Sequence, residues 1–320
     1  MSIAVMGAGA FGTALAITLS RTQPVTLWAR EAGAVAEMRE RRENTRRVPG
    51  CPFPDALQIS AEMGDVAAAE TVLVAGPLQT MRGLLASAAP LFRARRVVAC
   101  CKGIELASVA TAPDIIRNAL PDAEPALLTG PSFARDIANG LPTALTLACA
   151  DAETGKLLQH QLSTPTLRLY RSADLIGAAL GGALKNVVAI ACGAAIGAEL
   201  GESARAAIMT RGFAEMGRFA VARGADPATM TGLSGFGDLA LTCTSDQSRN
   251  YRLGLALGRK EKFDPNVTVE GAATARALAQ EAAQTGLDLP IATAVAALVE
   301  NRLDVSQAIV DLLSRTLKEE

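Results

Sequence analysis

The sequence predicts an α/β protein of two parts, in which a doubly wound, largely parallel sheet is followed by an all-α domain. Short apolar segments alternate with helical patterns through the first half of the 320-residue chain. This alternation is typical of repeated strand–helix–strand units. After residue 172 the strand signal ends and only helical periodicity continues. We therefore divide the chain into residues 1–179 and residues 180–320.

The first half contains the expected sheet and its connecting helices. The expected strands are 2–6, 25–29, 57–60, 71–75, 96–100, 126–129, 143–149 and 166–170. The expected helices are 10–20, 32–43, 78–89, 108–119, 132–139 and 152–162.

The second half opens with an apolar run, residues 175–198, in which Lys185 is the only charged residue. A run of this length can cross a bilayer. A lysine at mid-depth is costly there, however, and several glycines weaken an isolated helix. We therefore predict a buried helix in a soluble protein and no membrane span. Lys185 is then either an acid–base group whose pKa burial lowers, or an ammonium whose stem lies on apolar surface.

The remaining helices of the second half follow the same periodicity. They are expected at 202–223, 227–231, 249–258, 271–284, 291–302 and 305–317. Gly224, Gly258 and Gly286 are interpreted as helix stop signals.

Composition argues against a nucleic-acid partner. The formal net charge is −1, from 31 basic and 32 acidic residues, and aromatic residues make up 3% of the chain. There is little capacity either to attract a polyanion or to stack bases. A basic cluster, Arg39, Arg41, Arg42, Arg46 and Arg47, alternates with glutamates and is interpreted as a solvated helix face.

The cysteines and the single histidine restrict the chemistry. The six cysteines show no metal-type spacing and lie mostly in apolar runs, as expected for reduced, buried thiols of a cytoplasmic protein. Residues 2–6 read as a core strand and not as a signal peptide. His160 alone makes Ser-His-Asp catalysis and a histidine metal site improbable, so we expect no metal. Lysine or carboxylate must then move any proton.

A glycine-rich turn follows the first strand and opens the first helix. Gly7, Gly9 and Gly12 form the pattern GxGxxG, with Ala10 and Phe11 between them. Such glycines permit a tight turn and close approach of a pyrophosphate to the helix N-terminus. In this context the turn predicts a Rossmann-like, dinucleotide-binding domain.

The residue after the second strand bears on the choice of dinucleotide. Arg30 stands where an NAD site usually has Asp or Glu. A guanidinium there can pair with a 2′-phosphate. Glu31 can take the acidic role, so we expect NADPH with NADH tolerated.

Two loops after later strands carry polar groups toward the same edge of the sheet. Lys102 follows the strand at 96–100, and Gly130 and Ser132 precede a short helix that Ser132 is expected to cap. Each is compatible with ordinary turn chemistry. Together they favour a small phosphorylated substrate.

The helical half adds a carboxylate and a basic helix start. Asp238 lies among glycines and apolar residues, and Ser248, Arg249 and Asn250 open a helix. Asp238 is expected to orient a catalytic ammonium, and Arg249 with Asn250 to hold a phosphate. The alternative is a capping Asp and a surface Arg.

Taken together these motifs resemble the NAD(P)-dependent glycerol-3-phosphate dehydrogenases of the bacterial type. The resemblance runs nearly end to end, and its motifs are residues 7–15, 102–105, 130–134, 180–187, 210–216, 235–239, 247–250 and 269–271. It implies reversible reduction of dihydroxyacetone phosphate to sn-glycerol 3-phosphate, which supplies the backbone of phospholipids. It also implies a cytoplasmic homodimer.

The resemblance assigns roles residue by residue. Lys185 is the general acid/base, and Asn186, Asp238 and Thr242 surround it. Substrate binding falls to Lys102, Gly130, Ser132, Lys185, Asp238, Ser248, Arg249 and Asn250. Cofactor contacts fall to the turn Gly7, Gly9, Ala10, Phe11 and Gly12, and to Arg30, Lys102, Ala134, Arg249 and Glu270.

Two rival functions are compatible with the same two-part plan. One is a β-hydroxyacid or ketopantoate reductase, whose substrates carry a carboxylate; Lys102 and residues 248–250 favour a phosphate instead. The other is a catalytically silent NADPH-sensing protein, against which Lys185 and Asp238 argue.

Overall fold

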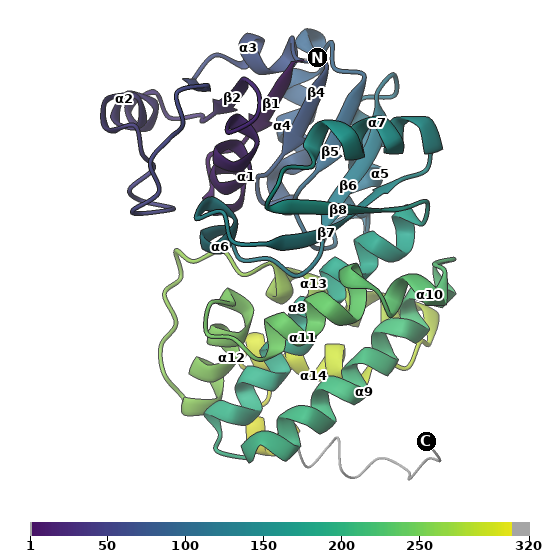
Figure 1. Ribbon diagram of the computed structural model, residues 1–320. Coiled ribbons are helices and arrows are strands. Elements are labelled where there is room, and N and C mark those ends of the chain that lie inside the picture. Colours follow the sequence, from purple (N-terminus) through teal and green to yellow (C-terminus); the bar gives the residue numbers. More distant parts are fainter. Residues whose placement is uncertain (1, 309–320) are drawn as a thin grey trace.

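In the computed structural model, which describes residues 2–308, an eight-stranded sheet adjoins a helical domain (Figure 1). The strand order is β3-β2-β1-β4-β5-β6-β7-β8. β1 to β6 run parallel, β7 is antiparallel to β6, and β8 is parallel to β7. The strands are β1 (Ile3–Met6), β2 (Val25–Trp28), β3 (Leu57–Ser60), β4 (Thr71–Val74), β5 (Arg96–Ala99), β6 (Glu124–Thr129), β7 (Thr143–Cys149) and β8 (Leu167–Ser172). All eight predicted strands are confirmed, and the order 3-2-1-4-5-6 is that of a Rossmann-like sheet.

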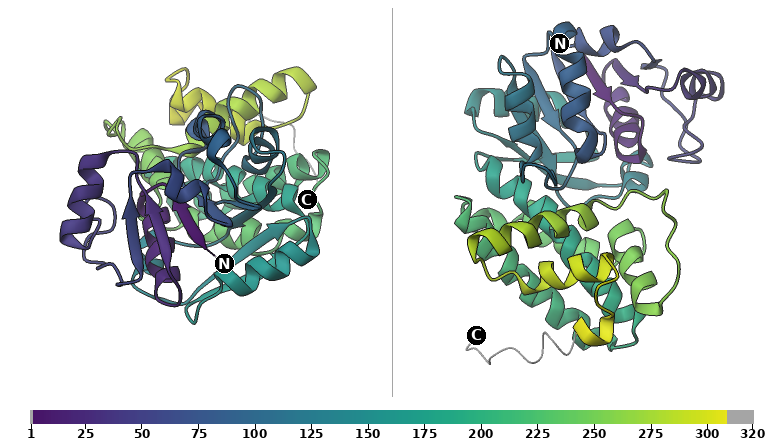
Figure 2. Two further views of the ribbon diagram at one scale, coloured as in Figure 1. Left: turned by 90° about the horizontal axis from the view of Figure 1, so that it is seen from above. Right: turned by 180° about the vertical axis from the view of Figure 1, so that it is seen from behind.

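Helices cover both faces of the sheet, so it is doubly wound as predicted (Figure 2). One face packs against α1 (Ala10–Ser20), α2 (Ala32–Arg41), α6 (Ala134–Ala138) and α7 (Ala152–Leu162). The other packs against α3 (Met63–Ala67), α4 (Leu78–Ala88) and α5 (Ala112–Ala119). A short 3-10 turn, η1 (Ala89–Leu91), follows α4.

Two helices of this half differ from expectation. α3 was not predicted, because five residues are too few for a clear apolar period. α5 begins at Ala112 and not at residue 108. Thr111 and Asp114 form a capping box there, and each side chain accepts from the other's backbone N–H.

The helical domain contains α8 (Leu175–Gly197), α9 (Gly201–Ala222), α10 (Pro227–Met230), α11 (Asp238–Cys243), α12 (Arg249–Arg259), α13 (Glu270–Thr285) and α14 (Pro290–Val299). A π-helical turn, η2 (Leu233–Gly237), precedes α11, and neither was predicted. Of the predicted helix 305–317, residues 305–308 are helical and the rest lies outside the described residues.

The apolar run forms α8, which is the core helix of this domain. It is long and apolar enough to cross a membrane, with a mean hydropathy of 1.8, but 89% of that window is buried inside the protein. Leu175, Ala178 and Ala179 pack with one core of the sheet, whereas the helix from Leu180 onward packs with the helical core. The prediction of a buried helix is therefore confirmed.

The glycines of α8 allow a close crossing with α12. A Cβ at Gly193 would lie 2.1 Å from the carbonyl oxygen of Tyr251, and one at Gly254 would lie 2.1 Å from that of Ile190. The glycines that would weaken an isolated helix thus let two backbones meet. Gly258 belongs to the same contact, so its prediction as a stop signal is wrong. Lys260, at φ 58°, ends α12 instead.

Candidate active site

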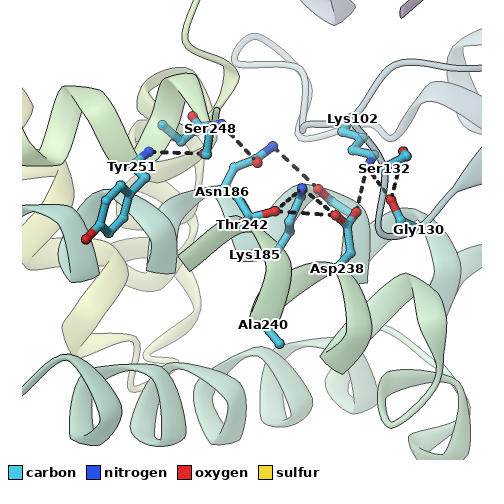
Figure 3. Close-up of polar contacts among 12 residues, drawn as sticks. Lys102, Gly130, Ser132, Lys185, Asn186, Asp238, Ala240, Thr242, Ser248 and Tyr251 are labelled. Carbon is cyan, nitrogen blue, oxygen red and sulfur yellow. Dashed lines mark hydrogen bonds and ion pairs between the residues drawn. The ribbon is translucent and has the colours of Figure 1, made fainter. Parts of the chain in front are cut away.

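Lys185 and Asp238 form a buried ion pair between α8 and α11 (Figure 3). Lys185 Nζ donates to Asp238 Oδ1 at 2.7 Å and to Thr242 Oγ1 at 2.5 Å. The side chains of Lys185 and Asp238 are 7% and 1% exposed. Lys185 therefore does not extend to solvent, and the alternative of an ammonium at the surface is wrong. The side chain of Asp238 does not cap the N-terminus of α11 but accepts from Lys185.

A second ammonium reaches the same carboxylate from the sheet. Lys102, in the loop after β5, donates through Nζ to Asp238 Oδ2 at 2.6 Å and to the carbonyl oxygen of Gly130 at 3.0 Å. Gly130 follows β6 and has φ +134°, a conformation that favours glycine. The carboxyl ends of β5 and β6 thus face the helical domain, as expected for a ligand-binding edge.

The unpredicted π-helical turn places Asp238 between the two lysines. A Cβ at Gly235 would lie 2.0 Å from the carbonyl oxygen of Met230, so the turn requires glycine there. Asp238 begins α11 directly after this turn. π-helical turns are rare and frequently lie at functional sites. In the sequence, the Gly-Phe-Gly segment before Asp238 is the feature that could have indicated this turn.

Burial lowers the pKa of Lys185 from 10.5 to about 8. The negative charge of Asp238 opposes this shift, whereas the positive charge of Lys102 adds to it. An amine with this pKa is present in both protonation states near neutral pH. It can therefore donate or accept a proton.

Asn186 and Asn250 connect three helices beside the lysine pair. Asn250 Nδ2 donates to Asn186 Oδ1 at 2.9 Å, and Asn250 Oδ1 accepts from the N–H of Gly271 at 2.9 Å. Ser248 caps α12 by accepting from the N–H of Tyr251. Arg249, the first residue of α12, is exposed.

The glycine-rich turn has the geometry of a phosphate cradle. Gly7 has φ +120°, and a Cβ at Gly12 would lie 2.1 Å from the carbonyl oxygen of Gly7. No side chain caps the first amides of α1, which begins at Ala10 and Phe11. An uncapped helix start after such a turn fits the pyrophosphate of a dinucleotide.

Glu270 carries a buried oxygen that no protein group satisfies. Its Oε1 accepts from the N–H of Leu78 at 3.2 Å, whereas Oε2 is buried without a hydrogen-bond partner among the described residues. Burial raises the pKa of this carboxyl group. Such an oxygen fits a ligand that donates a hydrogen bond at the sheet edge.

Other predicted residues lie near the same edge. Ala134 begins α6, and Arg30 is exposed in the segment after β2. The prediction that Ser132 caps α6 is wrong: Phe133 is the N-cap residue, and Ser132 Oγ donates to the carbonyl oxygen of Gly130 at 3.2 Å. Ser132 therefore belongs to the cluster of Lys102 and Gly130.

The fold and the site together define a class: a two-domain oxidoreductase with a dinucleotide-binding sheet and a buried lysine at its edge. Comparison with known proteins agrees. The "NAD-dependent glycerol-3-phosphate dehydrogenase N-terminus" family matches residues 2–155, and the corresponding "C-terminus" family matches residues 174–310. The chain therefore belongs to the NAD-dependent glycerol-3-phosphate dehydrogenase family.

Individual relatives cover the whole chain. A "Glycerol-3-phosphate dehydrogenase [NAD(P)+]" of Ruegeria sp. (strain TM1040) is 60% identical over 100% of both chains. The crystal structure of a glycerol-3-phosphate dehydrogenase from Coxiella burnetii has a TM-score of 0.92 and 35% identity, covering 98% of this chain and 99% of that one. A ketopantoate reductase from Ralstonia eutropha, at 18% identity and a TM-score of 0.63 over 94% of this chain and 98% of that one, shares the fold alone.

The arrangement predicts opposite pKa shifts of Lys185 in two variants. Lys102→Gln removes a repelling charge and should raise that pKa above about 8, whereas Asp238→Asn removes an attracting charge and should lower it. NMR titration of isotope-labelled lysine side chains measures both. Lys156→Gln, at an exposed lysine, is the control and should leave Lys185 unchanged. Shifts in the same direction would contradict this electrostatic account.

Proposed function

We propose that this protein catalyses the reversible reduction of dihydroxyacetone phosphate to sn-glycerol 3-phosphate with NADPH, and that it tolerates NADH. The product supplies the backbone of phospholipids. The observation that carries the proposal is the buried Lys185 at the sheet edge, with a pKa of about 8 and hydrogen bonds to Asp238 and Thr242. Its family membership supports the same reaction.

Lys185 is the proposed general acid/base. The bound reduced nicotinamide supplies the hydride to the carbonyl carbon. The Lys185 ammonium donates its proton to the carbonyl oxygen, and in the reverse direction the neutral amine removes the hydroxyl proton. Asp238 and Thr242 orient the amine through their hydrogen bonds. Asn186 lies next to Lys185 on α8 and accepts a hydrogen bond from Asn250. This bond holds α8 and α12 together beside the site.

The substrate phosphate is assigned to groups from both domains. Arg249 and Asn250 open α12, where Ser248 caps the helix, and a helix start with an arginine favours a phosphate. Lys102, with Gly130 and Ser132, lines the sheet side of the site. The two ammonium groups of Lys102 and Lys185 share one carboxylate, so the site carries excess positive charge for an anionic substrate.

The dinucleotide is assigned to the carboxyl edge of the sheet. The turn of Gly7, Gly9, Ala10, Phe11 and Gly12 would hold the pyrophosphate. Arg30 would hold the 2′-phosphate. The remaining contacts are proposed for Lys102, Ala134, Arg249 and Glu270.

We also retain the division into a dinucleotide-binding domain, residues 1–179, and a catalytic domain, residues 180–320. The change of core between Ala179 and Leu180 supports this boundary. The six cysteines are buried and free, which suits a cytoplasmic protein. The proposed assembly is a homodimer.

The first test removes the proposed acid/base. Lys185→Ala should lower kcat by about 10³-fold, within the range of general acid–base catalysis, while the affinity for NADPH stays unchanged. Steady-state kinetics and cofactor titration measure the two effects, with Lys156→Ala as the control. A variant that lost substrate affinity but kept its maximal turnover would show that Lys185 only binds substrate.

The second test concerns the cofactor. Arg30→Asp should decrease kcat/KM for NADPH relative to NADH by about tenfold or more, because a charge-assisted contact with the 2′-phosphate is replaced by repulsion. Arg41→Asp, at an exposed arginine at the opposite end of α2, is the control. An unchanged cofactor ratio in Arg30→Asp would refute the role of Arg30.

A further inference from the structure

The prediction that the basic cluster is a solvated helix face holds only in part: Arg39 and Arg41 are exposed on α2, whereas Arg42, Arg46 and Arg47 follow it. Its members have different partners. Arg39 and Arg42 donate to backbone carbonyl groups in and before β3. Arg41 and Arg46 both pair with Glu37. Among the described residues, four of these five arginines therefore have structural partners. The guanidinium of the fifth, Arg47, has none.

Arg47 lies on a loop that is fixed against the glycine-rich turn. Asn44 Nδ2 donates to the carbonyl oxygen of Ala8 at 3.0 Å and to Thr13 Oγ1 at 2.9 Å. The backbone N–H of Arg47 donates to the carbonyl oxygen of Asn44 at 3.1 Å, and the next residue, Val48, is buried in the core. The loop is therefore held in place, while the side chain of Arg47 is exposed.

The positive charge of Arg47 acts on Arg249, which opens α12 in the helical domain. The pKa of the Arg249 guanidinium is lowered, first by partial desolvation and then by the positive charges of Arg252 and Arg47, whereas Glu270 opposes the shift. None of these three arginines has an ion-pair partner within 4.0 Å in residues 2–308. In Figure 1 the loop after α2 descends toward the helical domain.

Like charges repel each other, and an anion that binds both of them removes the repulsion. We propose that Arg47 and Arg249 bind the pyrophosphate of the dinucleotide together, one from each domain, and so hold the domains around it. The pyrophosphate is favoured over the other phosphates because Asn44 fixes the loop to Ala8, inside the turn that opens α1. This inference rests on the proposed dinucleotide binding, and it adds a cofactor-binding residue that the sequence motifs do not contain.

Titrations of NADPH and NADH, followed by quenching of the single tryptophan, Trp28, test the proposal. Arg47→Gln should weaken both dinucleotides by about tenfold, because both contain the pyrophosphate, and should reduce the salt dependence of binding. Arg47→Lys, which keeps a positive charge that can bind phosphate, should stay within about threefold of the wild type. Arg46→Gln, at the neighbouring arginine that pairs with Glu37, is the matched control and should change neither affinity.

Three outcomes would overturn the proposal. Arg47→Gln would bind both dinucleotides like Arg46→Gln, or it would weaken NADPH alone, which indicates the 2′-phosphate. In the third outcome, Arg47→Gln would raise only the KM for dihydroxyacetone phosphate at saturating NADPH, which would show that Arg47 binds the substrate phosphate. The titrations need no turnover, so a protein that bound both dinucleotides through Arg47 but reduced no dihydroxyacetone phosphate would contradict the proposed function and not this inference.

Discussion

One buried carboxylate holds the two halves of the site together. Asp238 accepts a hydrogen bond from Lys185 of the core helix at one oxygen and from Lys102 of the sheet at the other. Removing one partner of a buried ion pair typically costs about 3–5 kcal/mol, because the remaining charge is left uncompensated. The carboxylate must therefore be placed accurately, and the packing around it serves that placement.

Close backbone contacts set this position. The π-helical turn before Asp238 depends on Gly235, and Gly181 of α8 lets the turn approach the core helix, because a Cβ there would lie 2.6 Å from the carbonyl oxygen of Ser234. Gly182 likewise lets Thr129 of β6 pack against the helix, because a Cβ there would lie 2.6 Å from Thr129 Oγ1. The glycines of the apolar run around Lys185 thus allow close packing against η2, β6 and α12. Its composition reflects packing within the protein and not insertion into a membrane.

The sequence was sufficient for the parts of the structure that depend on local pattern. Strand–helix alternation and the glycine-rich turn predicted the sheet, and the apolar run around Lys185 predicted a buried helix. The π-helical turn escaped prediction because it depends on contacts with α8 rather than on an apolar period. The partners of the basic cluster escaped for a similar reason: Arg46 and Arg47 are adjacent in sequence, yet Arg46 pairs with Glu37 and the charge of Arg47 acts on Arg249 of the helical domain. Such distinctions arise only when distant segments meet.

The central claim is that one proton on Lys185 controls the reaction in both directions. The most direct measurement is the pH dependence of kcat/KM between about pH 7 and 9.5, for ketone reduction and for alcohol oxidation. Reduction requires the ammonium, so its rate should fall as pH rises through about 8, and oxidation requires the neutral amine, so its rate should rise through the same pH. Profiles that are flat in this range, or that change in the same direction, would contradict the account.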